Sequence, residues 1–159
     1  AAIQKFEKAG LQYCIPAAGL TEISTALIAN KYKYSMGCMR GANGEACLNC
    51  LKCYRKMAIQ GTPIPLNPEA QKKLGDKILP MLHIFLWCRK HRKFEDIFFN
   101  NKDIYDTSWV DKWYPRSIEY IPFDLRHFFQ QKLVEFGISE MSEGEINVLE
   151  AWHSRVPDV

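Results

Sequence analysis

Apolar residues recur along most of the chain at helical spacing, so its elements are predicted to be mainly α-helices. Residues 1–10 are predicted to end an amphipathic helix at Gly10, and residues 11–16 to form one short buried strand. Thr21 is expected to cap a second helix that runs to about residue 30. Its core-facing residues are expected to be Ile23, Leu27 and Ile28.

The middle of the chain is predicted to alternate between loop and helix. A glycine-rich loop spans 32–44, and a helix is expected from 53 to about 60. Asn67 followed by Pro68 has the pattern of a helix N-cap and first helical residue, and Pro80 is expected to bend that helix. Its core-facing residues are expected to be Leu74, Ile78, Met81, Leu82 and Phe85.

The last third of the chain is rich in aromatic residues. Residues 94–120 are predicted to be irregular or to form short helices held on a core by their rings. Pro122 is expected to open a helix that Gly137 ends. Ser142 and Glu145 have the spacing of a capping box for a final helix. The residues predicted to face the core are Leu125, Phe128, Phe129, Leu133 and Phe136 in the first of these helices, and Ile146, Leu149 and Trp152 in the second.

Four of the six cysteines lie in one short stretch, as Cys38-x8-Cys47-x2-Cys50-x2-Cys53. Zn–S bonds of about 2.3 Å place the sulfurs of a tetrahedral site roughly 3.8 Å apart, a separation that a Cys-x2-Cys turn delivers without strain. Zinc is the expected metal, and an iron–sulfur cluster, which also takes four thiolates, is the alternative. Without a metal, these residues would form a disulfide pair or remain buried free thiols.

A site closed by four sulfurs has no open position for water or substrate, so the metal is expected to stabilise a loop rather than to catalyse. Lys52 and Arg55 lie beside the ligands, where they balance the thiolate charge or contact a phosphate or carboxylate of a substrate. No catalytic residue is assigned. Cys14 and Cys88 are expected to be buried small hydrophobes.

Size and charge narrow the function classes only a little. The 159 residues are enough for one domain with its own core, and the net charge of +3 argues neither for nor against nucleic acid. The basic run 89–93 could contact RNA phosphates, or could simply be a favourable helix end. The longest apolar stretch, near 80–88, is too short to span a bilayer. Reduced cysteines and the lack of a secretory signal predict a cytoplasmic protein.

Three features share an order with a known family: the segment Ile15 to Ile23, the segment Tyr34 to Cys38, and the cysteine spacing. Together they resemble the carboxy-terminal part of the 7-cyano-7-deazaguanine synthases and their PP-loop ATP pyrophosphatase relatives. The likeness covers about residues 11–60. It implies that Cys38, Cys47, Cys50 and Cys53 are zinc ligands.

The same resemblance implies a fold and a domain organisation. The chain would be the distal part of an α/β protein of the adenine nucleotide α-hydrolase type. Residues 1–60 would end the PP-loop-like region, with the zinc loop at 38–53, and residues 61–159 would be a helical extension packed with it as one unit. The family's lysine after Thr21 is replaced by Glu22, and Met36 and Gly37 separate the family's serine and cysteine.

The chain lacks the SGGxDS turn with which PP-loop enzymes bind ATP phosphates. The resemblance therefore implies that an ATP-binding half, or a partner chain, supplies that turn. Its chemistry would be adenylation of a carboxylate or similar oxygen, followed by attack of a nitrogen or sulfur nucleophile. The alternative hypothesis is a non-enzymatic zinc module that binds a protein or nucleic-acid partner. A homo-oligomer is compatible with either hypothesis.

Overall fold

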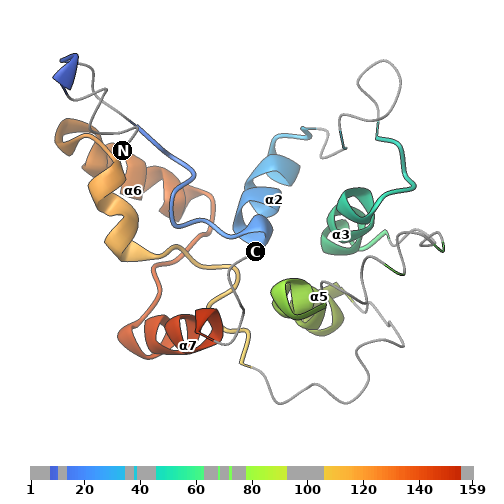
Figure 1. Cartoon of the computed structure of the whole chain (residues 1–159). Coiled ribbons are helices and arrows are strands. Elements are labelled where there is room, and N and C mark those ends of the chain that lie inside the picture. The colour runs from blue at the N-terminus through green and yellow to red at the C-terminus, as the bar shows by residue number, and fades with distance from the viewer. Residues whose placement is uncertain are drawn as a thin grey trace.

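The computed structural model describes residues 8–10, 14–34, 38, 46–62, 68, 72, 78–92 and 106–154. In this part of the chain the regular elements are all helices, which confirms the mainly helical prediction. They are α2 (Glu22–Lys31), α3 (Leu51–Gln60), α5 (Ile78–Arg92), η3 (Pro115–Tyr120), η4 (Phe123–Leu125), α6 (Arg126–Glu135) and α7 (Glu143–His153). Figure 1 shows α3 beside α5 on one side of α2, with α6 and α7 on the other side.

The strand predicted for 11–16 is wrong over its described residues, 14–16. Ile15 donates one backbone hydrogen bond to Tyr120, after which residues 16–19 form a turn. Extended pairing among the described residues is limited to two isolated bridges, which join Trp113 to Leu20 and to Glu140. The described end of this apolar stretch therefore leads into a turn and does not pair with another strand. Residues 11–13 lie outside the described part of the chain.

Helix α2 begins as predicted, because Thr21 is its N-cap. The Thr21 hydroxyl accepts a hydrogen bond from the backbone N–H of Ser24 at 3.1 Å. It also donates to the carbonyl of Val110, while the Ser24 hydroxyl donates to the carbonyl of Lys112 at 3.2 Å. These two contacts fix the start of α2 to the segment 106–114, and Ile23 beside them is fully buried.

Helix α3 starts two residues earlier than predicted, with Cys50 as its N-cap. It ends at Gly61, whose φ of 80° is a left-handed conformation that favours glycine. Helix α5 packs against α3. Its Met81, Leu82 and Phe85 are buried, as predicted. Pro80 lies within α5, and the predicted start at residue 67 is outside the described residues.

The main core joins α2, α3, α5 and α7 with the segment around residue 110. Its largest fully buried members include Phe85, Ile59 and Leu82. A second, smaller cluster lies beside α6. Its buried members are Trp113, Leu133 and Ile138. Two rings of the aromatic segment 94–120 lie in these clusters, as predicted for that segment, since Trp109 and Trp113 are each 3% exposed.

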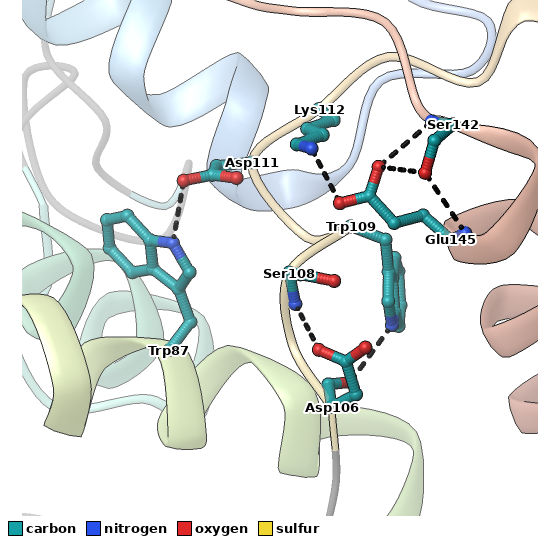
Figure 2. Close-up of polar contacts among 8 residues, drawn as sticks. All are labelled: Trp87, Asp106, Ser108, Trp109, Asp111, Lys112, Ser142 and Glu145. Atoms are coloured by element: carbon teal, nitrogen blue, oxygen red, sulfur yellow. Dashed lines mark hydrogen bonds and ion pairs between the residues drawn. The ribbon is translucent and has the colours of Figure 1, made fainter.

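The irregular segment 106–113 is held by side-chain hydrogen bonds (Figure 2). Trp87 on α5 donates from its indole nitrogen to Asp111 at 3.1 Å. Lys112 forms an ion pair with Glu145 on α7. The segment therefore bridges two helices that are distant in sequence. The prediction of irregular structure or short helices for 94–120 is confirmed over 106–120, where an irregular stretch is followed by the short helix η3.

Helix α6 departs from the predicted pattern. Phe129 and Phe136 are partly buried and Leu133 is buried, but Leu125 and Phe128 are 45% and 58% exposed. The prediction that these last two face the core is therefore wrong. Leu125 lies in a separate 3-10 turn, η4, that precedes α6, so the helical period of α6 does not include it. Phe128 lies within α6 itself, and its exposure follows from which face of that helix packs on the core. Gly137 ends the segment at φ 76°, as expected.

Helix α7 carries the predicted capping box. The Ser142 hydroxyl accepts from the backbone N–H of Glu145, and the Glu145 carboxylate accepts from the backbone N–H of Ser142 at 2.9 Å. Ile146 is buried. Leu149 and Trp152 are partly buried against the main core.

Among the described residues, no helix combines the length and the apolar character needed to cross a bilayer.

Candidate metal centre

The four cysteines of the predicted site come from two pieces of chain. Cys47 lies at the start of a bend that leads to Cys50, the N-cap of α3, and Cys53 lies in the first turn of that helix. Cys38 is described without its immediate neighbours in the chain. Cys38 and Cys53 are buried, whereas Cys47 and Cys50 are half-buried. The centre therefore lies at the surface edge of the core, at the N-terminus of α3.

The structure brings all four sulfurs together, within 4.8 Å of one another. The Sγ atoms of Cys47 and Cys53 are 3.8 Å apart. That separation is far longer than a disulfide bond of about 2.05 Å, and it equals the edge of about 3.8 Å that four Zn–S bonds of 2.3 Å impose on a tetrahedron. All four residues are free cysteines. The donor set and its spacing therefore fit a zinc ion, and four thiolates also suit an iron–sulfur cluster.

The surroundings of the sulfurs affect their ionisation unequally. A hydrogen bond from the backbone of Asn49 lowers the pKa of Cys47, but contact with the Cys38 thiol and burial outweigh it and raise that pKa to about 12. Burial raises the pKa of Cys50, but a hydrogen bond from the backbone of Cys53 and the neighbouring thiols bring it below its ordinary value. The start of α3 thus supplies an N–H group that stabilises a thiolate at the centre.

The two charged residues proposed from the sequence lie differently. Lys52 is exposed in the first turn of α3. Arg55 points to α2 and α5 instead of standing free: its Nη2 lies 3.2 Å from Oε2 of Glu22, and its Nη1 donates to the sulfur of Met81 at 2.9 Å. Arg55 therefore connects the helix that carries the cysteines to the core.

Both members of this ion pair and His83 on α5 share one feature, a buried polar atom without a hydrogen-bond partner among the described residues. Three buried side-chain atoms have no hydrogen-bond partner in the described part of the chain: Oε1 of Glu22, Nε of Arg55 and Nδ1 of His83. His83 packs against the rings of Trp109 and Trp152, with ring centroids 5.2 and 5.8 Å away. Burial, together with the charges of His153 and Arg55, lowers the pKa of His83 to about 4. His83 is therefore neutral at neutral pH.

Neither Glu22 nor His83 was identified as a site residue from the sequence. Glu22 occupies the first position of a helix, where an acidic residue is expected for the helix dipole alone. A single histidine in an apolar helix is usually a packing residue. No local pattern could have paired Glu22 with Arg55, which is distant in sequence and on another helix.

The two cysteines outside the cluster differ in burial, and one arginine of the basic run packs against the core. Cys88 is fully buried, as predicted, and burial raises the pKa of its thiol to about 12. Cys14 is exposed, so its predicted burial is wrong. It lies at the edge of the turn that replaces the expected strand. In the basic run, Arg92 stacks over the ring of Trp87 and donates to the carbonyl of Ile59 at 2.8 Å. Arg92 therefore joins the end of α5 to α3.

Comparison with known proteins places the chain in one family. No curated protein and no solved structure matches it. A family model matches residues 2–76 and 93–153, and the first of these stretches contains all four clustered cysteines. The matched residues make up most of the chain, and the protein therefore belongs to the family of unknown function DUF6395.

Proposed function

We propose that this chain is the zinc-bearing carboxy-terminal part of an ATP-dependent adenylating ligase that resembles the 7-cyano-7-deazaguanine synthases. The observation that carries the proposal is the gathering of four sulfurs within 4.8 Å at the x8, x2, x2 spacing of that family. The order of the flanking segments, Ile15 to Ile23 and then Tyr34 to Cys38, supports it. The nucleotide-binding turn would come from an ATP-binding half or a partner chain.

In this proposal the metal has a structural role. Four thiolates leave no open coordination position, so the ion would join the loop at Cys38 and the bend at Cys47 to the start of α3. The ion pair of Arg55 with Glu22 then fixes α3 against α2. Lys52 is exposed beside the centre, where it could contact the carboxylate or phosphate of a substrate. Thiolate ligands favour a reducing compartment, which is why we include a cytoplasmic location in the proposal.

Metal content is the first test. Purified protein is expected to contain one zinc ion per chain by mass spectrometry, with no absorption in the visible range. Cys50→Ser is expected to lose the metal and the folded far-UV circular dichroism signal, because binding and folding share one free energy. Cys14→Ser is the matched control, since Cys14 is exposed and outside the cluster. Iron with visible absorption would favour the cluster alternative, and metal-free folded protein would overturn the proposal.

Enzymatic activity is tested separately. The chain alone is expected not to catalyse exchange of pyrophosphate into ATP. Exchange should appear when the chain is combined with the protein segment, encoded in frame or next to it, that carries an SGGxDS turn. If zinc is present but no such segment binds the chain or restores exchange, the ligase assignment fails. The non-enzymatic zinc module would then be the better description.

A further inference from the structure

Two lysines and two tyrosines alternate from the last residue of α2 onward, as Lys31, Tyr32, Lys33 and Tyr34. The tyrosine side chains are among the exposed large rings of the described chain: Tyr32 is 53% exposed and Tyr34 is 70% exposed. Their ring centroids are 6.1 Å apart, with the planes tilted by 37°. Lys33 between them is exposed as well. The end of α2 therefore presents two neighbouring rings with cations beside them.

The backbone of this segment is ordered by its own hydrogen bonds. The N–H of Lys33 donates to Asn30 at 3.0 Å, and the N–H of Tyr34 donates to Ala29 at 3.0 Å. Lys33 has a φ of 57°, so the chain turns sharply at this residue. Exposed rings on an ordered turn lose less conformational entropy on binding than rings on a loose tail. The two tyrosine rings are therefore preorganised for contact with a ligand.

Helix α6 extends the same surface. Tyr32 meets the ring of Phe136 edge to face at 5.6 Å, and the amino group of Lys31 lies over that ring at 5.6 Å. Further along α6, Phe128 is 58% exposed and the amino group of Lys132 lies 5.4 Å from its ring centroid. We call Lys31, Tyr32, Lys33, Tyr34, Phe128 and Lys132 the tyrosine–lysine surface.

The charge of this surface is positive. Segments 31–34 and 128–136 together contain three lysines and one acidic residue, Glu135. The Glu135 carboxylate pairs with Lys132 at 2.7 Å. The backbone carbonyl of Glu135 accepts a hydrogen bond from Lys31. Lys33 therefore remains beside the two tyrosines with no carboxylate of these segments paired to it, and the local field attracts anions.

We propose that the tyrosine–lysine surface binds single-stranded nucleic acid. Exposed rings stack on unpaired bases, which all have a π face, and interleaved lysines contact the phosphates. A duplex keeps its bases stacked inside and would use only the lysines, so the exposed rings favour the single strand. The surface uses none of the four clustered cysteines, and the inference does not depend on the ligase proposal.

Fluorescence anisotropy with a labelled single-stranded oligouridylate tests this inference on the full metal-loaded chain. Tyr34→Ala is expected to weaken binding roughly tenfold, because stacking on one ring is lost. Tyr34→Phe should retain binding. Lys33→Gln should lower the slope of log affinity against log salt by about one. A duplex of the same length should bind more weakly than the single strand.

Two control variants distinguish this surface from other exposed rings and cations. Phe123→Ala removes a ring that is 85% exposed in η4, and Lys90→Gln removes an exposed cation on α5. Both should bind the oligonucleotide as the parent does. Absence of binding at about 50 mM salt would overturn the proposal. So would a loss in either control as large as that in Tyr34→Ala, or equal losses in Tyr34→Phe and Tyr34→Ala.

Discussion

The guanidinium of Arg55 lies 3.2 Å from the carboxylate of Glu22, and this ion pair joins the helix that begins at the cysteine cluster to the helix beside it. Each partner keeps one buried polar atom without a hydrogen bond in the described part of the chain. Burying the two charges therefore costs desolvation free energy, and the pair contributes to stability only when both members are present.

The effects of removing the two members of this pair should not be additive. We expect Arg55→Met and Glu22→Gln each to lower the free energy of unfolding by about 1–2 kcal/mol, because a partly buried charge or polar group is left without its partner. The double variant should lose about 0.5–1 kcal/mol less than the sum. Urea unfolding measures all three, and strictly additive losses would contradict the coupling.

Gly19 should be the least replaceable glycine of the described chain. It has a φ of 75°, and a Cβ there would lie 2.1 Å from the hydroxyl of Ser117 and 2.8 Å from the carbonyl of Tyr114. Ser117 cannot easily move, because its hydroxyl accepts a hydrogen bond from the indole N–H of Trp113 and donates one to the carbonyl of Ala18. We expect Gly19→Ala to cost about 3 kcal/mol or more of unfolding free energy.

Gly137 provides the matched control for that substitution. Its φ of 76° is almost the same, but a Cβ there would meet nothing within 4 Å. Gly137→Ala should therefore cost only the backbone strain, about 1–2 kcal/mol. Thermal melts of the two variants would separate strain from steric overlap. Equal losses would show that the contact with Ser117 does not matter.

His83 should make stability depend on pH in mildly acidic solution. Its pKa is lowered from 6.5 to about 4, first by burial and then by the charges of His153 and Arg55. The unfolded chain therefore binds a proton more readily, so this contribution is present above pH 6.5 and is lost as the pH falls toward 4. The loss should be about 3 kcal/mol.

Replacing His83 by phenylalanine tests this assignment. His83→Phe retains an aromatic ring between Trp109 and Trp152 but cannot take up a proton. Its unfolding free energy should fall less steeply between pH 6.5 and 4 than that of the parent, as measured by urea denaturation. His127→Phe is a suitable control, because His127 is exposed on α6. An unchanged pH profile in His83→Phe would contradict the prediction.

Glu145 should stabilise the start of α7 only at pH values at which its carboxyl group is ionised. Burial would raise the pKa of Glu145, but hydrogen bonds from Lys112 and Ser142 lower it from 4.5 to about 2. Its contribution is therefore present above pH 4.5 and is lost as the pH falls to 2. We expect Glu145→Gln to cost about 1–2 kcal/mol at pH 7. The parent and the variant should converge near pH 2.

The control for this helix is a second acidic residue in the same first turn. Glu143 is 73% exposed and pairs with Arg116 at the surface, so Glu143→Gln should change stability by less than about 0.5 kcal/mol. Circular dichroism at pH 7 and pH 2 measures both variants. A persistent deficit of Glu145→Gln at pH 2 would show that the carboxylate charge is not what stabilises the helix.

The sequence alone determined the features that depend on a few neighbouring residues. Thr21 and Ser142 were predictable as helix caps, and Gly137 as a helix end, because each acts on backbone groups within about four positions. The cysteine spacing predicted the cluster for the same reason, since tight turns bring Cys47, Cys50 and Cys53 together. The domain division at residue 60 stays a prediction.

Only the tertiary structure decided which distant groups meet. The pairing of Arg55 with Glu22, and the place of His83 between two indoles, join helices that no local pattern relates. The exposure of Phe128 likewise depends on where α6 lies against the core, and not on the apolar character of the residue. Hydrophobic burial and buried ion pairs are set by contacts across the whole fold, whereas caps and turns are set by the backbone nearby.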